Sequence, residues 1–177
     1  GLSEVPVYPG AGDGVLAHLS TSGLVRSQIS STIGTSGALR VASQEPLIDQ
    51  EGKIWNYSLF PDWWISGGAL NNGGITLKWF IKNFEGNEET VQSEEIYVKI
   101  NEYVKNTDPG ASGLIFAPFL TGERSPEWRP YMKGGLVGLT ISHGKEEIAR
   151  SIMEGVIFRM RAVKDQLAPY LPEEITI

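Results

Sequence analysis

The sequence predicts a mixed α/β domain, in which helices flank a sheet. The near-continuous apolar run 113–120 is typical of a strand that is buried on both faces. Apolar residues recur at helical spacing from 148 to 167, and we expect this long helix to pack across the sheet. Further strands are predicted, from β-branched and apolar runs between polar or glycine-rich turns, over residues 29–33, 39–42, 54–59 and 63–65.

Length and composition predict a single domain and exclude several functions. The chain has 177 residues, 41% of them hydrophobic, which is enough for an ordinary core. A net charge of −6 argues against non-specific nucleic-acid binding, so small molecules or other proteins are the expected partners. Because cysteine is absent, thiol catalysis and disulfides are excluded, in agreement with a cytoplasmic location. The apolar runs are too short to span a membrane, and the N-terminus does not resemble a signal peptide.

Both ends of the sequence suggest a piece of a longer polypeptide. The chain begins at Gly1 without an initiator methionine. It stops at residues 174–177, where an apolar strand is only starting. We therefore expect a truncated domain over residues 1–177.

The segment 31–40 has the pattern of a β-hairpin with a polar turn. The turn consists of Gly34, Thr35, Ser36 and Gly37, between apolar segments on either side. Glycines allow backbone N–H groups to turn toward an anion, and the two hydroxyls add donors beside them. The turn is therefore a candidate phosphate site; the alternative is an exposed hairpin without a ligand.

A second candidate is Asp13, which lies among three glycines in the segment 9–14. Apolar residues after it predict a short helix that leads to Gly23, so its carboxylate would lie near a helix N-terminus, where it is stabilised. The alternative is that Asp13 is simply an N-cap. The glycines do not fit the dinucleotide-binding pattern, because Val15 stands where the last glycine is needed.

A third glycine-rich segment, 66–75, follows the strand at 63–65 and precedes a helix that Asn83 and Gly86 end. Gly74 would lie near the start of this helix, which is a natural place for phosphate. A glycine needed only for close packing would look the same. Farther along, residues 85–108 predict an exposed loop and a surface helix, with a solvated carboxylate cluster at Glu88, Glu89, Glu94 and Glu95.

The charged loop 121–130 follows the apolar run 113–120, and loops in such positions often carry function. The alternative is that an ion pair between Glu123 and Arg124 merely shapes the loop. The long helix is expected to begin near 142–145 and to end before Pro169, with Arg150 and Glu154 paired on one face.

The chain resembles the C-terminal domain of the FGGY carbohydrate kinases, and most of all gluconate kinases. Four blocks in the family's order cover nearly the whole chain: Gly10–Asp13; Ile33–Gly37; Gly67–Gly74 with Trp79; and Pro118–Pro126 continued through Gly138 and Leu139, His143 to Arg150, and Glu154 and Gly155. Each block alone is unspecific, but four in order are specific. The sequence Asn71-Asn72-Gly73-Gly74 resembles the gluconate kinases more than the xylulose or glycerol kinases and so favours gluconate as the substrate.

The resemblance implies a ribonuclease H-like, actin-like ATPase fold with a mixed sheet, and a cleft in which ATP and sugar meet. By resemblance, Asp13 is the catalytic base and Thr35 lies beside the nucleotide phosphates, together with the rest of its turn. Gly74 and Lys78 occupy positions that line the nucleotide site in relatives, although the position of Lys78 varies among them. Mg²⁺ would bridge the phosphates without an assigned protein ligand.

The resemblance also implies that the sugar-binding N-terminal domain precedes Gly1 and that a segment contacting adenine follows Ile177. We therefore expect few sugar contacts and no turnover from this fragment alone, with the missing domain as its partner. Exposed sheet edges would favour pairing with a second copy as a homodimer.

Three alternatives of other classes remain. Residues 34–38 are one residue away from the Gly-x-Ser-x-Gly elbow of serine hydrolases, with Ser36 as the nucleophile and His143 plus Asp13 or Asp108 completing a triad. The fold could also serve a non-catalytic actin-like binding module. A zinc site is the weakest candidate, because His18 and His143 are the only histidines.

Overall fold

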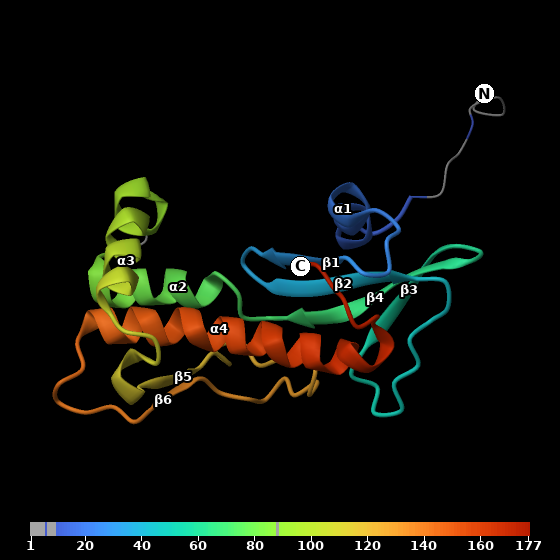
Figure 1. Cartoon of the computed structure of the whole chain (residues 1–177). Helices are drawn as coiled ribbons and strands as arrows, with labels where there is room; N and C mark the ends of the chain where they lie inside the picture. Colours follow the sequence, from blue (N-terminus) through green and yellow to red (C-terminus); the bar gives the residue numbers. More distant parts are fainter. Residues whose placement is uncertain (1–5, 7–9, 88) are drawn as a thin grey trace.

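The computed structural model describes residue 6, residues 10–87 and residues 89–177. The fold contains a four-stranded sheet with helices on both faces, and one long helix joins this sheet to a second group of elements (Figure 1). The strands of the sheet are β1 (Ile29–Ile33), β2 (Gly37–Ser43), β3 (Trp55–Phe60) and β4 (Trp63–Leu70). They lie in the order β1-β2-β4-β3, and every neighbouring pair is antiparallel.

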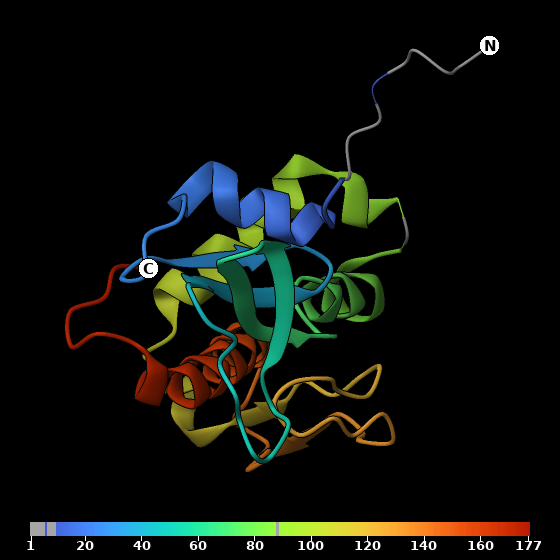
Figure 2. The same cartoon turned by 90° about the vertical axis from the view of Figure 1, so that its right-hand side faces the viewer.

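Two helices cover opposite faces of this sheet, as Figure 2 shows. Helix α1 (Asp13–Ser22) lies on one face, where Val15 packs with Ala42 and Ile65. Helix α4 (Lys145–Leu167) lies on the other face, and its C-terminal half packs on residues of β1, β2 and β4. Side chains alternate across the sheet, so residues of β2 serve both layers.

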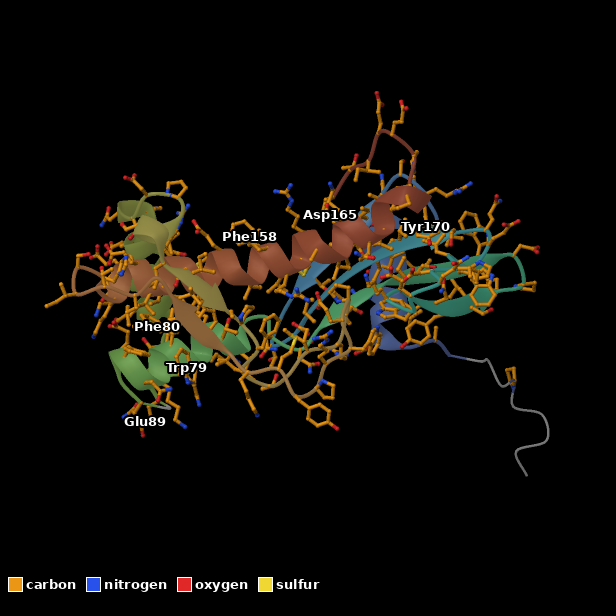
Figure 3. All side chains as sticks on the ribbon, turned by 90° about the horizontal axis from the view of Figure 1, so that it is seen from below. Trp79, Phe80, Glu89, Phe158, Asp165 and Tyr170 are labelled. Atoms are coloured by element: carbon orange, nitrogen blue, oxygen red, sulfur yellow. The ribbon has the colours of Figure 1, made fainter. Side chains whose placement is uncertain are left out.

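The N-terminal half of α4 supports the second group of elements. This group comprises α2 (Ile75–Phe80), a π-helical turn (Ile81–Glu85), α3 (Glu94–Asn106), and the two antiparallel strands β5 (Ile115–Ala117) and β6 (Gly135–Val137). Figure 3 shows Phe80 between α2 and α4, where it is fully buried with Ala149 and Ile152. The 3₁₀ turns are Thr90–Gln92, Ala111–Gly113 and Ala168–Tyr170.

The structure confirms the predicted hairpin, the helix after Asp13, the helix after Gly74 and the long helix that ends before Pro169. The four strands pair antiparallel, and one isolated parallel bridge, between Gln28 and Thr176, lies beside β1, where Ile29 N donates to Thr176 O at 2.8 Å. Arg150 and Glu154 pair as expected, with Nε and Oε1 2.6 Å apart. None of the described helices is both long and apolar enough to cross a membrane.

Two expectations are wrong. The glycines at 67 and 68 belong to β4 rather than to a loop. Glycine is required there by close packing, because a Cβ on Gly67 would lie 2.0 Å from Leu39 O and one on Gly68 2.5 Å from Val163 Cγ1. The run 113–120 is not a strand buried on both faces: β5 has three residues, pairs only with β6, and leaves Ile115 61% exposed. Phe116 of this run packs instead with Ala149 and Ile152 of α4.

Candidate active site

Asp13 is the first residue of α1 and its carboxylate is exposed. Gly12 is the N-cap, so the interpretation of Asp13 as the cap is wrong. Its Oδ1 accepts a hydrogen bond from Gly14 N at 2.6 Å. An exposed carboxylate at the positive end of a helix is available to a ligand.

Arg40 connects the start of α1 with the hairpin, and it is not among the site residues predicted from the sequence. Its Nη1 donates to Thr32 Oγ1 at 2.9 Å, and a Cβ on Gly14 would lie 2.7 Å from its Nη2. Burial lowers the pKa of Arg40, which the nearby Asp13 and Tyr57 only partly offset. The available signal was a charged residue at a position of an apolar strand that faces the α1 side of the sheet.

A cleft of about 680 Å³ opens beside Asp13. Its lining includes Asp13 and its glycine neighbours, residues of three strands, and two residues of the loop 121–130. Among the side chains that line it are Arg40, Tyr57, Arg124 and Trp128. The cleft therefore offers cationic, anionic and aromatic groups in one cavity of the size that small-molecule sites have.

The turn of the β1–β2 hairpin is held against the start of α2. Gly34 O accepts a hydrogen bond from Gly74 N at 2.7 Å, and Thr35 O accepts from Gly73 N at 3.1 Å and from Ile75 N at 3.2 Å. The side chains of Thr35 and Ser36 are exposed, whereas Gly37 is buried as the first residue of β2. Two of the predicted glycine-rich segments are thus in direct contact.

This contact leaves the backbone N–H of Gly74 without a free hydrogen for a ligand. Its N–H, like that of Gly73, is occupied by a hairpin carbonyl and is not offered to a phosphate. A Cβ on Gly73 would lie 2.6 Å from Ser36 O, and one on Gly74 2.9 Å from Gly34 O, so close packing requires both glycines. Lys78 is exposed on the next turn of α2. Nucleotide binding by Gly74 and Lys78 stays a prediction.

The loop 121–125 is fastened to the end of β4 by side-chain amides. Asn72 Nδ2 donates to Gly122 O at 2.6 Å, and Asn72 Oδ1 accepts from Thr121 N at 3.1 Å. Asn71 Nδ2 donates to Thr121 O at 3.2 Å. Ser125 N also donates to Ala69 O at 3.0 Å. Since residues 73–75 bind the hairpin turn, the loop and the hairpin are linked through residues 69–75 at and after the end of β4.

Glu123 is the buried centre of that loop, and the alternative of an ion pair with Arg124 is wrong. Its Oε1 accepts from Asn71 N at 2.7 Å and from Arg124 N at 2.9 Å, while the nearest cationic group is Arg159, whose Nε lies 3.9 Å from Oε2. Burial raises the pKa of Glu123 although these three groups lower it. Arg159 also forms an ion pair with Glu127.

The geometry removes the serine hydrolase hypothesis. A nucleophile elbow requires a strand, a sharp turn and a helix, but Ser36 lies in a turn between two strands. His143 Nδ1 instead accepts from Thr140 N at 2.9 Å. His18 is buried with its Nδ1 2.7 Å from Ser30 Oγ, and burial followed by Arg40 lowers its pKa. Among the described residues, no group of three or more metal-ligating side chains occurs.

The layered sheet and the hairpin that meets a glycine-rich helix start define an actin-like ATPase domain, and comparison with known proteins identifies its family. Residues 29–174 match the FGGY family of carbohydrate kinases, C-terminal domain, and the chain belongs to this family. The match begins at Ile29, so it does not include Asp13.

Relatives and solved structures agree with this assignment. The gluconokinase of Bacillus subtilis (strain 168) is 41% identical over 166 residues, which cover 90% of this chain and 32% of that protein. A xylulose kinase of Lactococcus lactis is 30% identical over 167 residues, or 92% of this chain and 31% of that protein. The gluconate kinase structure from Lactobacillus acidophilus has a TM-score of 0.81 and 32% identity, covering 93% of this chain and 32% of that chain.

The chain therefore spans about a third of the length of these relatives. The expected ribonuclease H-like, actin-like fold is confirmed by the structural match.

Proposed function

We propose that this chain is the C-terminal, nucleotide-binding part of an ATP-dependent kinase that converts gluconate to 6-phosphogluconate. Membership of the FGGY family and the 41% identity to a gluconokinase support the proposal. The observation that carries it is the arrangement around Arg40. Its guanidinium lies beside Gly14, next to Asp13, and donates to Thr32 close to the hairpin turn. Arg40 thus lies between the candidate base and strand β1 of the candidate phosphate hairpin.

Asp13 is proposed as the general base. Phosphoryl transfer needs a positioned nucleophile, a carboxylate that accepts its proton, and charge stabilisation. As the sugar hydroxyl oxygen bonds to the γ-phosphorus, its proton passes to the Asp13 carboxylate and ADP leaves. The exposure of this carboxylate at the cleft supports the role, because the substrate can reach it.

The hairpin turn is proposed to hold the ATP phosphates. The exposed hydroxyls of Thr35 and Ser36 would donate to phosphate oxygens, and Gly34 and Gly37 keep the neighbouring backbone bare. Gly74 would act through its missing side chain, since its N–H already binds Gly34 O. Mg²⁺ bound to the phosphates would neutralise their charge, with water completing its coordination.

The rest of the kinase is proposed to supply the sugar-binding wall of the cleft. The relatives are about three times as long as the matched region, which supports a sugar-binding domain outside this chain. We expect the 177-residue chain alone to be inactive. A xylulose kinase is the second candidate, because such relatives reach 30% identity.

Substitution of Asp13 in the full-length kinase tests the proposal. Asp13→Asn should lower kcat by about 10²- to 10⁴-fold, because the amide cannot accept the proton, while KM for ATP changes less than about twofold. Asp62→Asn is the matched control, because this exposed aspartate lies in the β3–β4 turn. A wild-type rate for Asp13→Asn would exclude it as the base, and a panel of gluconate, xylulose and glycerol identifies the substrate.

A further inference from the structure

The cleft beside Asp13 contains two guanidinium groups in different electrostatic surroundings. Arg40 lies close enough to Asp13 for the carboxylate to raise its pKa against the effect of burial. Arg124 comes from the loop 121–130 and forms no ion pair with any carboxylate among the described residues. The acidic side chain next to it in sequence, Glu123, is turned toward backbone N–H groups and Arg159.

The position of Arg124 is fixed from both ends of the residue. Its backbone N donates to Glu123 Oε1 at 2.9 Å, and its Nη2 donates to Leu70 O at 3.0 Å. The next residue is held as well, because Ser125 N donates to Ala69 O. An arginine anchored in this way loses little conformational freedom when it binds a ligand.

Part of the hydrogen-bonding capacity of Arg124 is unused. The Nε atom is buried and has no partner among the described residues, and Nη2 makes the only side-chain hydrogen bond. A buried donor without an acceptor is costly, so an acceptor in the complete complex is expected. The guanidinium fork matches the two oxygens of a carboxylate or phosphate better than any other side chain does.

The charges of the cleft favour an anion. Two guanidinium groups and one carboxylate line it, although the whole chain has a net charge of −6. These side chains leave one positive charge of the cleft unbalanced, and Arg124 forms no ion pair among the described residues. A small anion would satisfy both this charge and the remaining donors.

We propose that Arg124 binds an oxyanion of the reactants in the Asp13 cleft. The proposal rests on the proposed kinase function and deepens it. The oxyanion has two possible sources, the carboxylate of a sugar acid and the transferring phosphoryl group, which present the same chemistry to a guanidinium. In the first case Arg124 selects the substrate, and in the second it stabilises the transition-state charge.

Three variants of the full-length kinase test this role. Arg124→Gln removes the charge, Arg124→Lys keeps the charge without the fork, and Arg129→Gln removes a charge from an exposed side chain of the same loop that does not line the cleft. The measurements are kcat and KM for gluconate and ATP, and the Kd values of gluconate, a non-hydrolysable ATP analogue and pyrophosphate by calorimetry. Melting temperatures establish that each variant is folded.

Each source predicts a different result. If Arg124 binds the sugar carboxylate, Arg124→Gln raises the Kd of gluconate 10- to 100-fold and leaves the Kd of the ATP analogue within twofold. If it binds the phosphoryl group, kcat falls 10- to 100-fold while the Kd of gluconate stays within twofold. Arg124→Lys should recover part of either loss, and it replaces Arg124→Gln in the comparison if the latter does not fold.

The proposal is overturned if folded Arg124 variants match Arg129→Gln within twofold in kcat and in all three Kd values. Failure of the proposed function has a different signature. If the wild-type protein phosphorylates no sugar but binds pyrophosphate at least tenfold more tightly than Arg124→Gln does, the anion site stands and the kinase assignment falls. If the wild type binds none of the three probes, both fall.

Discussion

The contact between the hairpin and the start of α2 predicts a large effect of one added methyl group. In Gly73→Ala the Cβ would lie 2.6 Å from Ser36 O, 2.7 Å from Ser36 C and 2.9 Å from Gly34 O. All three atoms belong to the backbone, so the turn must move away. The movement would break the three hydrogen bonds that join residues 73–75 to the turn. At about 1 kcal/mol for each hydrogen bond, the contact between the turn and the start of α2 loses about 3 kcal/mol.

We expect this loss to appear in nucleotide binding. About 3 kcal/mol corresponds to a change of roughly 100-fold in an equilibrium constant, so KM for ATP should rise at least tenfold in the full-length kinase. The melting temperature should also fall. Gly135→Ala is the matched control, because a Cβ there meets nothing within 4 Å. If Gly73→Ala shows the melting temperature and the KM for ATP of the control, the hairpin is not held by this close approach.

Two further predictions concern the second group of elements. Ile152→Ala should lower the free energy of unfolding by about 3 kcal/mol, since this side chain of α4 is fully buried. Ile157→Ala, at a position 55% exposed, should lower it by less than about 1 kcal/mol. The melting temperatures of the two variants measure the difference. Burial alone would raise the pKa of Glu85, but its ion pairs with Lys99 and Lys145 outweigh this and hold it below the ordinary 4.5. The stability that Glu85 contributes is therefore present above pH 4.5 and is lost as the pH falls further, so the difference in melting temperature between wild type and Glu85→Gln should shrink below pH 4.5.

The sequence predicts those elements whose signal is local. The hairpin, the helix after Asp13 and the long helix follow from periodicity and turn residues within a few positions of each other. The predicted strand ends at residue 65, short of the end of β4, because Gly67 and Gly68 are typical of loops. Their reason lies elsewhere in the chain, in the close approach of Leu39 and Val163.

Parts of the candidate site could not be predicted because their partners are far apart in sequence. The Arg124 side chain binds Leu70 O, and the Glu123 carboxylate lies beside Arg159, so these two charged side chains, adjacent in sequence, form no ion pair with each other. Arg40 stands in an apolar strand with no motif around it that indicates a function. Its importance is visible only once Gly14 and Thr32 lie next to it.

The motifs that identify the family are neighbours in space, and this separates their residues by task. Asn72 binds Thr121 and Gly122, and Gly73 permits the contact with Ser36. These residues hold one motif against the next and have used their polar groups in doing so. The carboxylate of Asp13 and the hydroxyl of Thr35 are exposed instead, and they are the groups that we propose to meet a ligand. Substitutions of the first kind should change stability and nucleotide binding together, whereas substitutions of the second kind should change catalysis in a protein of unchanged stability.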